Sequence, residues 1–212
     1  MGTYNKGILG AFSGKVGPVV GASWRGKEVM RSLPKKGNRV PTATQLLQRQ
    51  KFAMVQTFLS GISPVVKRYY GSNSGLKTRG NNAMSYLMRE ALVFTDPDFE
   101  WDYSKVLISR GDLTGIEEAS VDVTPGEINV MWTDNSEQGE ALADDKLVLL
   151  VYDPESKAVV FSLAAGERAD EATSLAMPSH LEDAEVQVWA TFVSADEKRF
   201  ATSLYLGSVT VI

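Results

Sequence analysis

Residues 184–193 read AEVQVWATFV, and within this segment Val186, Val188, Ala190 and Phe192 occupy every second position. A period of two places these four side chains on one face of a β-strand, so the segment predicts a strand with one buried face. Short β-type segments separated by turn residues also occur near residues 104–108, 119–124, 127–133, 146–152, 158–163, 171–176 and 201–211.

Strands at this spacing predict an antiparallel, immunoglobulin-like β-sandwich over residues 103–212. We expect a fibronectin type III-like topology, with Trp132 on an early strand and Trp189 on a late strand in the core between the two sheets. The residues before this segment predict a different architecture. The predicted fold class is therefore α+β, with a first domain over residues 1–102 and a second over residues 103–212.

Two to three helices are predicted in the second half of the first domain. Thr42 lies three residues before Gln45, which is the spacing of a capping box, and the helix that begins there ends at Gly61. A short second helix with proline in its first turn is predicted at residues 63–70. A third helix, capped by Asn81 or Asn82 and apolar on one side, is predicted to continue through residue 93.

Glycine recurs in the first 26 residues, at positions 2, 7, 10, 14, 17, 21 and 26. Glycine at this density disfavours helix, and the apolar side chains between the glycines disfavour free solvation. We therefore expect an extended arm that packs onto another surface, including a hairpin with strands at 19–24 and 28–33 and a turn at Arg25-Gly26-Lys27. The apolar residues of this assembly arm are Ile8, Leu9, Phe12, Val16, Val19, Val20 and Trp24.

Charge is distributed unequally along the chain, whose formal net charge is −4. Residues 1–80 contain 14 Lys and Arg against Glu28 alone, or +13, and residues 81–212 contain 8 Lys and Arg against 25 acids, or −17. A basic region attracts nucleic acid or the acidic region of another copy, and the two halves of one chain can also attract each other. The basic residues assigned to a subunit or nucleic-acid contact are Arg25, Lys27, Arg31, Lys35, Lys36, Arg39, Lys67 and Arg68.

Catalytic and metal chemistry finds little support in the sequence. The chain contains no cysteine, which excludes disulfides, thiolate metal sites and cysteine nucleophiles. His180 is the only histidine, and no nucleophile-elbow motif accompanies it. The acidic segments 96–102 and 144–145 lack the pattern of an EF-hand loop, and we interpret them as acidic surface. We therefore predict no catalytic residue, no metal site, no cofactor and no small-molecule substrate.

Several segments resemble an uncharacterised family of Bacteroidota proteins. The resemblance is carried by GILGAFSGKVG at 7–17, GASWRG at 21–26, RQKF at 49–52, NAMSY at 82–86, SRG at 109–111 and WTDN at 132–135. It spans nearly the whole chain and implies a glycine-rich N-terminal motif followed by an immunoglobulin- or fibronectin III-like domain. The family has no established activity, so the resemblance implies no function.

Two functions remain open on these observations. The first, which we favour, is a non-enzymatic structural protein that self-assembles into a filament, ring or shell through its arm and through basic-to-acidic subunit contacts. The alternative is a non-specific nucleic-acid-binding, virion or packaging protein that uses its basic part. The start of the chain lacks the apolar stretch of a signal peptide, and no apolar run reaches the roughly 20 residues of a membrane span. We expect a cytoplasmic homo-oligomer without membrane contact, with the virion as an alternative location.

Overall fold

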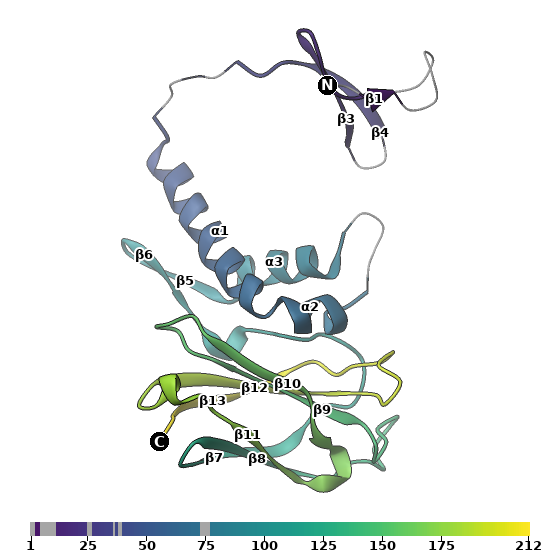
Figure 1. Ribbon diagram of the computed structural model, residues 1–212, viewed down its shortest axis with the longest axis vertical. Helices are drawn as coiled ribbons and strands as arrows, with labels where there is room; N and C mark the ends of the chain where they lie inside the picture. The colour runs from purple at the N-terminus through teal and green to yellow at the C-terminus, as the bar shows by residue number, and fades with distance from the viewer. Residues whose placement is uncertain (1–2, 5–11, 25–26, 36, 38–39, 73–76) are drawn as a thin grey trace. The chain divides into compact units, whose positions relative to one another are not determined.

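The computed structural model describes residues 3–4, 12–24, 27–35, 37, 40–72 and 77–212. The chain divides into two compact units, Met1–Ala43 with Ser74–Leu76, and Thr44–Asn73 with Lys77–Ile212. Both units can be followed in Figure 1.

The first unit contains an antiparallel sheet in the order β1-β2-β3-β4. Its strands are β1 (Thr3–Tyr4), β2 (Phe12–Val16), β3 (Val19–Trp24) and β4 (Lys27–Ser32). The pairing of β3 with β4 confirms the predicted hairpin, although Lys27 lies opposite Trp24 and therefore belongs to a strand and not to the turn. Residues 12–16 of the expected extended arm are also paired, since Val16 lies opposite Val19.

Gly21 lies where β2 and β3 approach each other closely. A Cβ atom at this position would be 2.0 Å from the carbonyl oxygen of Phe12 and 2.8 Å from a carbon of its ring. Glycine therefore allows the Phe12 ring to cover the middle of β3. Gly17, in the turn between the two strands, has a φ of 57°, which glycine adopts without steric cost. The glycine-rich pattern thus specifies a paired sheet.

Three helices precede the sheets in the described part of the second unit. The helices α1 (Ala43–Gly61) and α2 (Ser63–Tyr69) confirm the first two predictions. The third, α3 (Arg79–Glu90), begins earlier than predicted because Thr78 caps it, its hydroxyl accepting a hydrogen bond from Asn81 N at 3.2 Å. The prediction of an asparagine cap at this helix is therefore wrong.

A β-hairpin replaces the predicted end of the third helix. Its strands are β5 (Leu92–Thr95) and β6 (Asp98–Trp101), joined across a cis Asp96–Pro97 peptide bond. The strand predicted at residues 104–108 is also wrong, because Tyr103–Lys105 form a short 310-helix. The Ser104 hydroxyl donates to the Asp102 carboxylate at 2.5 Å, and a local bond of this kind competes with strand pairing.

The remaining strands form two antiparallel sheets, with the orders β10-β9-β12-β13 and β11-β8-β7. The strands are β7 (Glu117–Thr124), β8 (Glu127–Thr133), β9 (Lys146–Tyr152), β10 (Val159–Glu167), β11 (Ala172–Ala176), β12 (Glu185–Val193) and β13 (Leu204–Thr210). Each of them coincides with a segment predicted as a strand after residue 118. The chain is therefore of mixed helix and strand content with antiparallel sheets, as predicted.

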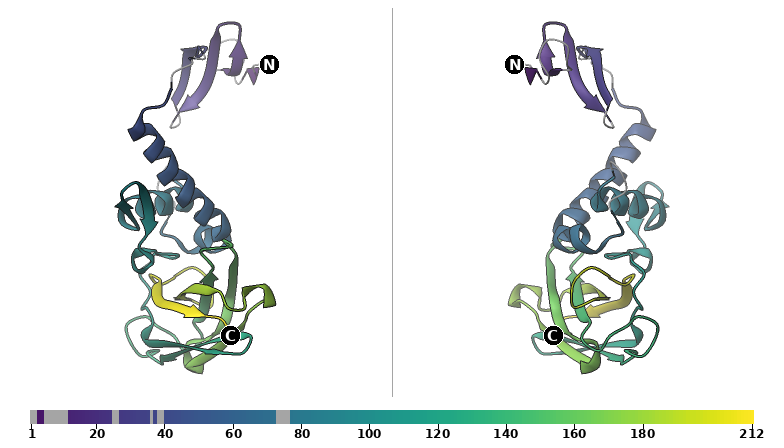
Figure 2. Two further views of the ribbon diagram at one scale, coloured as in Figure 1. Left: turned by 90° about the vertical axis from the view of Figure 1, so that its left-hand side faces the viewer. Right: turned by 90° about the vertical axis from the view of Figure 1, so that its right-hand side faces the viewer.

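The four-stranded sheet is buried on both faces. One face packs against the three-stranded sheet, in a core to which β12 contributes Val186, Val188, Ala190 and Phe192. The other face packs against the helices, in a core that includes Trp189 of the same strand. Figures 1 and 2 show the resulting layers: the helices, then the four-stranded sheet, then the three-stranded sheet.

This arrangement corrects the prediction for residues 184–193. The alternating apolar residues do face one core, but the expectation of a single buried face is wrong, because Trp189 is 0% exposed on the opposite side. Its ring centroid lies 6.2 Å from that of Phe58 on α1, and its Nε1 donates to Val106 O at 3.1 Å. Trp132 lies in the core between the sheets, as predicted, whereas Trp189 lies between the sheet and the helices.

The helices belong to the same compact unit as the two sheets. The boundary predicted after residue 102 does not coincide with the division between the units, which falls between Ala43 and Thr44. The physical reason is that the helix-facing side of the four-stranded sheet is apolar and needs the helices to cover it.

We expect Phe58→Ala to lower the free energy of unfolding by about 3–5 kcal/mol, because this ring is 1% exposed and lies in the core shared by helices and sheet. Phe52 lies on the same helix but is 50% exposed, so Phe52→Ala is a matched control that should cost less than about 1 kcal/mol. Urea unfolding followed by circular dichroism measures both. Equal, small losses in the two variants would contradict a shared core.

Candidate interaction surface

One face of the N-terminal sheet carries an apolar cluster beside Ser23, Ser32 and Glu28, which the register places on the same side. The register places Val16 opposite Val19 and Met30 opposite Gly21, so these side chains lie on the same side of the sheet. The Phe12 ring covers Gly21 on this side. This apolar face therefore consists of residues from all three of the longer strands.

The opposite face carries basic side chains and an indole ring. Lys15, Val20 and Arg31 form one cross-strand row, and Trp24 lies opposite Lys27 on the same side. Trp24 is 59% exposed, and the three basic residues are also exposed. A face of this composition can contact carboxylates, phosphates or an apolar patch flanked by acids.

The described part of this sheet has almost no interior. From residue 12 to residue 40, Gly21 is the only described residue that is buried. Val16 and Met30 on the apolar face are 47% and 72% exposed. Isolated apolar residues on a surface are ordinary, whereas apolar side chains that lie side by side on an exposed face are typical of contact surfaces.

The predicted site residues fall in three places. The N-terminal sheet contains seven of them: Phe12, Val16, Val19, Val20, Trp24, Lys27 and Arg31. Exposed Lys35 follows this sheet. Five others lie outside the described residues, namely Ile8, Leu9, Arg25, Lys36 and Arg39. Lys67 and Arg68 lie on α2 in the second unit, where Arg68 Nη1 is 3.8 Å from Glu197 Oε2. The second basic cluster therefore has an acidic neighbour within its own unit.

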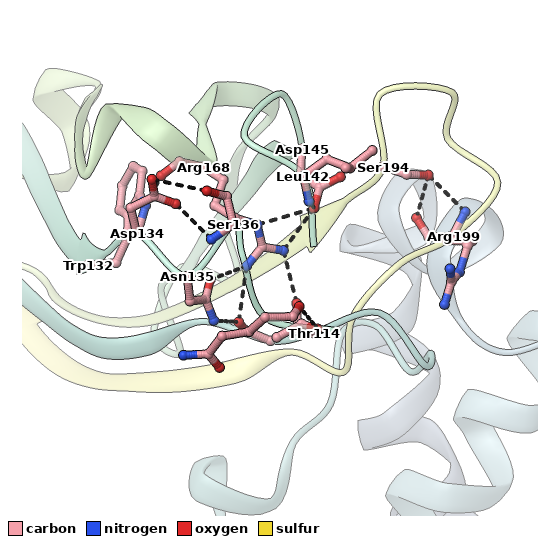
Figure 3. A network of polar contacts seen from close by, with 12 residues as sticks. Thr114, Trp132, Asp134, Asn135, Ser136, Leu142, Asp145, Arg168, Ser194 and Arg199 are labelled. Atoms are coloured by element: carbon pink, nitrogen blue, oxygen red, sulfur yellow. Dashed lines mark hydrogen bonds and ion pairs between the residues drawn. The ribbon is translucent and has the colours of Figure 1, made fainter. Parts of the chain in front are cut away.

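A buried arginine that the sequence did not single out contacts several loops beside the two stacked sheets (Figure 3). The guanidinium of Arg168 donates to Asp145 Oδ2 from Nε at 3.2 Å and from Nη2 at 3.0 Å. It also donates to Thr114 O at 3.0 Å and to Asn135 Oδ1. Its central carbon lies 3.9 Å from the centroid of the Phe192 ring.

Arg168 has a structural role. The side chains of Arg168 and Asp145 are 0% and 1% exposed, and burial lowers the pKa of Arg168 although its carboxylate partner acts in the opposite direction. The indole Nε1 of Trp132 donates to Arg168 O at 2.8 Å, which joins this cluster to the sandwich core. No signal in the sequence distinguishes this arginine from a surface one, since its partners are distant along the chain.

The residues considered for catalysis and metal binding are dispersed in the structure. His180 is exposed in a short 310-helix, Ser179–Leu181. Asp98 accepts a hydrogen bond from Gln50, and Asp102 pairs with Lys105 at 2.9 Å. Within the part of the chain that the structure describes, no three His, Asp or Glu side chains gather as metal ligands would.

Two shallow grooves flank α1 in the second unit. One, of about 430 Å³, is lined by residues of all three helices, among them Phe52, Leu59 and Met84, with Lys67 at its rim. The other, of about 390 Å³, is lined by Met54, Trp101 and Tyr152 among others, with Lys157 at its rim. Neither lining includes Asp, Glu or His among the described residues. No described helix is long and apolar enough to span a membrane.

The fold and the surface together define a two-unit protein of mixed helix and strand content, whose first unit contains a small sheet with basic side chains. The chain belongs to a family of unknown function, DUF6266, whose family model matches residues 11–207. The matched residues include β2–β4 of the N-terminal sheet. The expectation of an uncharacterised family is confirmed. No curated protein and no solved structure matched the chain.

We expect Arg168→Met to lower the free energy of unfolding by about 3–5 kcal/mol, because it leaves the Asp145 carboxylate buried without its counter-ion. Arg199→Met is the matched control, since Arg199 pairs with Glu140 and Asp112 while 39% exposed and should contribute at most about 1 kcal/mol. Denaturant titration of both variants measures the difference. A loss in Arg168→Met no larger than that in the control would show that the buried pair does not hold the loops.

Proposed function

We propose that this chain is a non-enzymatic structural protein that assembles with copies of itself through its N-terminal sheet. The observation that carries the proposal is that Gly21 alone is buried among the described residues from 12 to 40. A sheet this small is stable in water only when an apolar face packs against another surface. The face that contains Val16 and Met30 is suited to that packing.

Charge complementarity favours a second copy of the chain as the partner. Residues 1–43 contain eight Lys and Arg against Glu28 alone, or +7, whereas residues 81–212 carry −17. Opposite charges steer two copies into a basic-to-acidic encounter and disfavour contact between two N-terminal sheets. A contact between two different surfaces repeats from copy to copy, so it generates a ring, a filament or a shell.

We further propose that residues 103–212 form a fibronectin type III-like sandwich. With β7 to β13 taken as successive strands A, B, C, C′, E, F and G, the two sheets have the orders E-B-A and C′-C-F-G. That order supports the topology. The fold alone indicates no activity, and the functional proposal depends on the N-terminal sheet.

Non-specific nucleic-acid binding is a second candidate that one observation favours. Lys15, Lys27 and Arg31 share a face of the sheet with Trp24. Cationic side chains bind phosphates, and an exposed indole can stack on an unpaired base. A packaging or virion role would follow from such binding.

Deletion of residues 1–40 tests self-assembly. We expect the full chain to scatter light as a multiple of its 23.1 kDa monomer and the deleted chain to be a monomer. The deleted chain should keep its unfolding transition, because the second unit has its own core. A full chain that is monomeric, or a deletion that leaves the mass unchanged, would reject self-assembly through this sheet.

Substitutions at two positions test whether the apolar side chains themselves are needed for assembly, since a deletion removes all of residues 1–40 at once. Val16→Ser with Met30→Ser should reduce the assembled fraction, whereas Val93→Ser with Leu142→Ser, which changes residues of similar exposure in the second unit, should not.

A gel shift with single-stranded DNA at about 50 mM salt examines the alternative, because phosphate-driven affinity is strongest at low salt. A monomer that binds DNA in this assay would support the second candidate instead.

A further inference from the structure

The terminal strands of the two sandwich sheets are not equally protected against pairing with another chain. The four-stranded sheet ends in β10 and β13, and the three-stranded sheet ends in β11 and β7. The pairings of β10 and β13 with their inner neighbours contain a register shift within the ladder, as a β-bulge produces. The pairing of β7 with β8 shifts only near its start, between Glu117 and Ser120, and the charged residues Glu117, Glu118 and Asp122 are what distinguish this strand from β11. Bulges at edges are a common way to block edge-to-edge association. The pairing of β11 with β8 is regular over all five residue pairs.

On the side of β11 that faces away from β8, three residues have backbone N–H and C=O groups that could bond to an added strand. Trp132 N donates to Glu171 O at 2.9 Å, and Met177 N donates to Gly126 O at 2.8 Å. Because ladder bonds in an antiparallel pair fall at every second residue, the N–H and C=O groups of Ala172, Ser174 and Ala176 point away from β8. All three residues are small and exposed, and β11 contains no proline and no charge.

The surroundings of β11 are acidic. Residues 169–197 contain seven Asp and Glu and no Lys or Arg. Asp170 and Glu171 directly precede the strand, and Glu127 lies opposite Ala176. The three strands of this sheet, β7, β8 and β11, contain no Lys or Arg. Two β11 edges would therefore repel each other, whereas a basic strand would be attracted.

The strand β4 of the N-terminal sheet has the complementary properties. It is the last strand of its sheet, and its pairing with β3 is regular over six residue pairs. Leu33 N donates to Pro18 O at 2.8 Å, which by the same alternation leaves the backbone groups of Glu28, Met30 and Ser32 pointing outward. Lys27 and Arg31 lie within the strand, and exposed Lys35 follows it.

We infer that β11 of one copy receives β4 of a second copy as an added strand, which joins the N-terminal sheet of one subunit to the sandwich of the next. The inference rests on the proposed self-assembly and names its acceptor. Main-chain hydrogen bonds between two three-residue edges hold the strands together, and the opposite charges select this pair over β4 with β4 and β11 with β11.

Ser174→Lys and Ser120→Lys form a matched test. Both serines are exposed on the outer face of the same sheet, Ser174 on β11 and Ser120 on the opposite terminal strand β7. Lysine on an edge strand blocks pairing, and at Ser174 it also repels the basic partner. We expect Ser174→Lys to weaken association of the full chain about tenfold in sedimentation or light scattering, and Ser120→Lys to leave it unchanged.

Cysteine cross-linking locates the contact directly, because the chain has no cysteine of its own. Met30→Cys and Ser174→Cys lie at the centres of the two open edges, so they face each other as a hydrogen-bonded pair when the added strand is antiparallel. When one variant carries a mass tag and the two are mixed and oxidised, we expect a mixed disulfide dimer in excess over both self-dimers. Met30→Cys mixed with Ser120→Cys is the control and should give no such excess.

The outcomes separate this inference from the proposed function. If deletion of residues 1–40 abolishes assembly while Ser174→Lys assembles like Ser120→Lys and no mixed disulfide forms, self-assembly stands and the β11 acceptor is wrong. A dominant Ser174→Cys self-dimer would also overturn it, since it would place two β11 edges together. If the full chain is a monomer at all concentrations, both proposals fail.

Discussion

The four-stranded sheet β10-β9-β12-β13 cannot leave either of its faces in water, and the architecture of the second unit depends on this constraint. In β9, Leu147, Leu149 and Val151 face the three-stranded sheet, while Val148 and Leu150 face the helices, and all five are at most 1% exposed. Antiparallel sheets commonly have one solvated face, so burial of both faces requires two covering layers. The helices are therefore a layer of the same compact unit as the two sheets.

The N-terminal sheet contrasts with the four-stranded sheet of the second unit, because its described residues form no comparable buried core. Burying a methionine or valine side chain contributes about 1.5–3 kcal/mol, and Met30 and Val16 realise only part of this while they are 72% and 47% exposed. Association with another surface can recover the remainder. The second unit therefore has its own core, and the N-terminal sheet presents apolar side chains that the proposed association would bury.

Periodicity predicted most elements but not what covers them. The helical spacing after residue 42 and the strand spacing after residue 118 are local signals, and the structure follows both. The second buried face of β12 was missed because Gln187 and Thr191 look solvent-facing in the sequence. Both are buried, and the partners that satisfy them lie far away: Tyr205 Oη donates to Gln187 Oε1 at 2.5 Å, and Ser109 Oγ donates to Thr191 Oγ1 at 2.8 Å.

The composition of the candidate surface could likewise be predicted, whereas its geometry could not. Apolar and basic residues in the first 40 positions are visible in the sequence, but only the register of β2, β3 and β4 assigns each of them to a face of the sheet. The 310-helix at 103–105 and the cap at Thr78 depend on single hydrogen bonds that compete with the broader pattern. Arg168 is identified by its partners, which come from three separate segments.

In the assembly that we propose, charge determines the orientation in which two copies meet, whereas the availability of a strand edge determines how tightly they bind. Fixed charges on an exposed surface are screened within about 8 Å at physiological salt, so they select the orientation of an encounter more than they hold it. Affinity must come from ladder hydrogen bonds and from burial of the apolar face, both of which require an edge that can be reached. The bulges within β10 and β13 disrupt two such edges, β7 carries three charged residues, and the acids around β11 disfavour its pairing with itself. Together these features favour a basic strand as the partner of β11. The proposed contact is therefore between two different surfaces, and it needs no specific side-chain interaction to select its orientation.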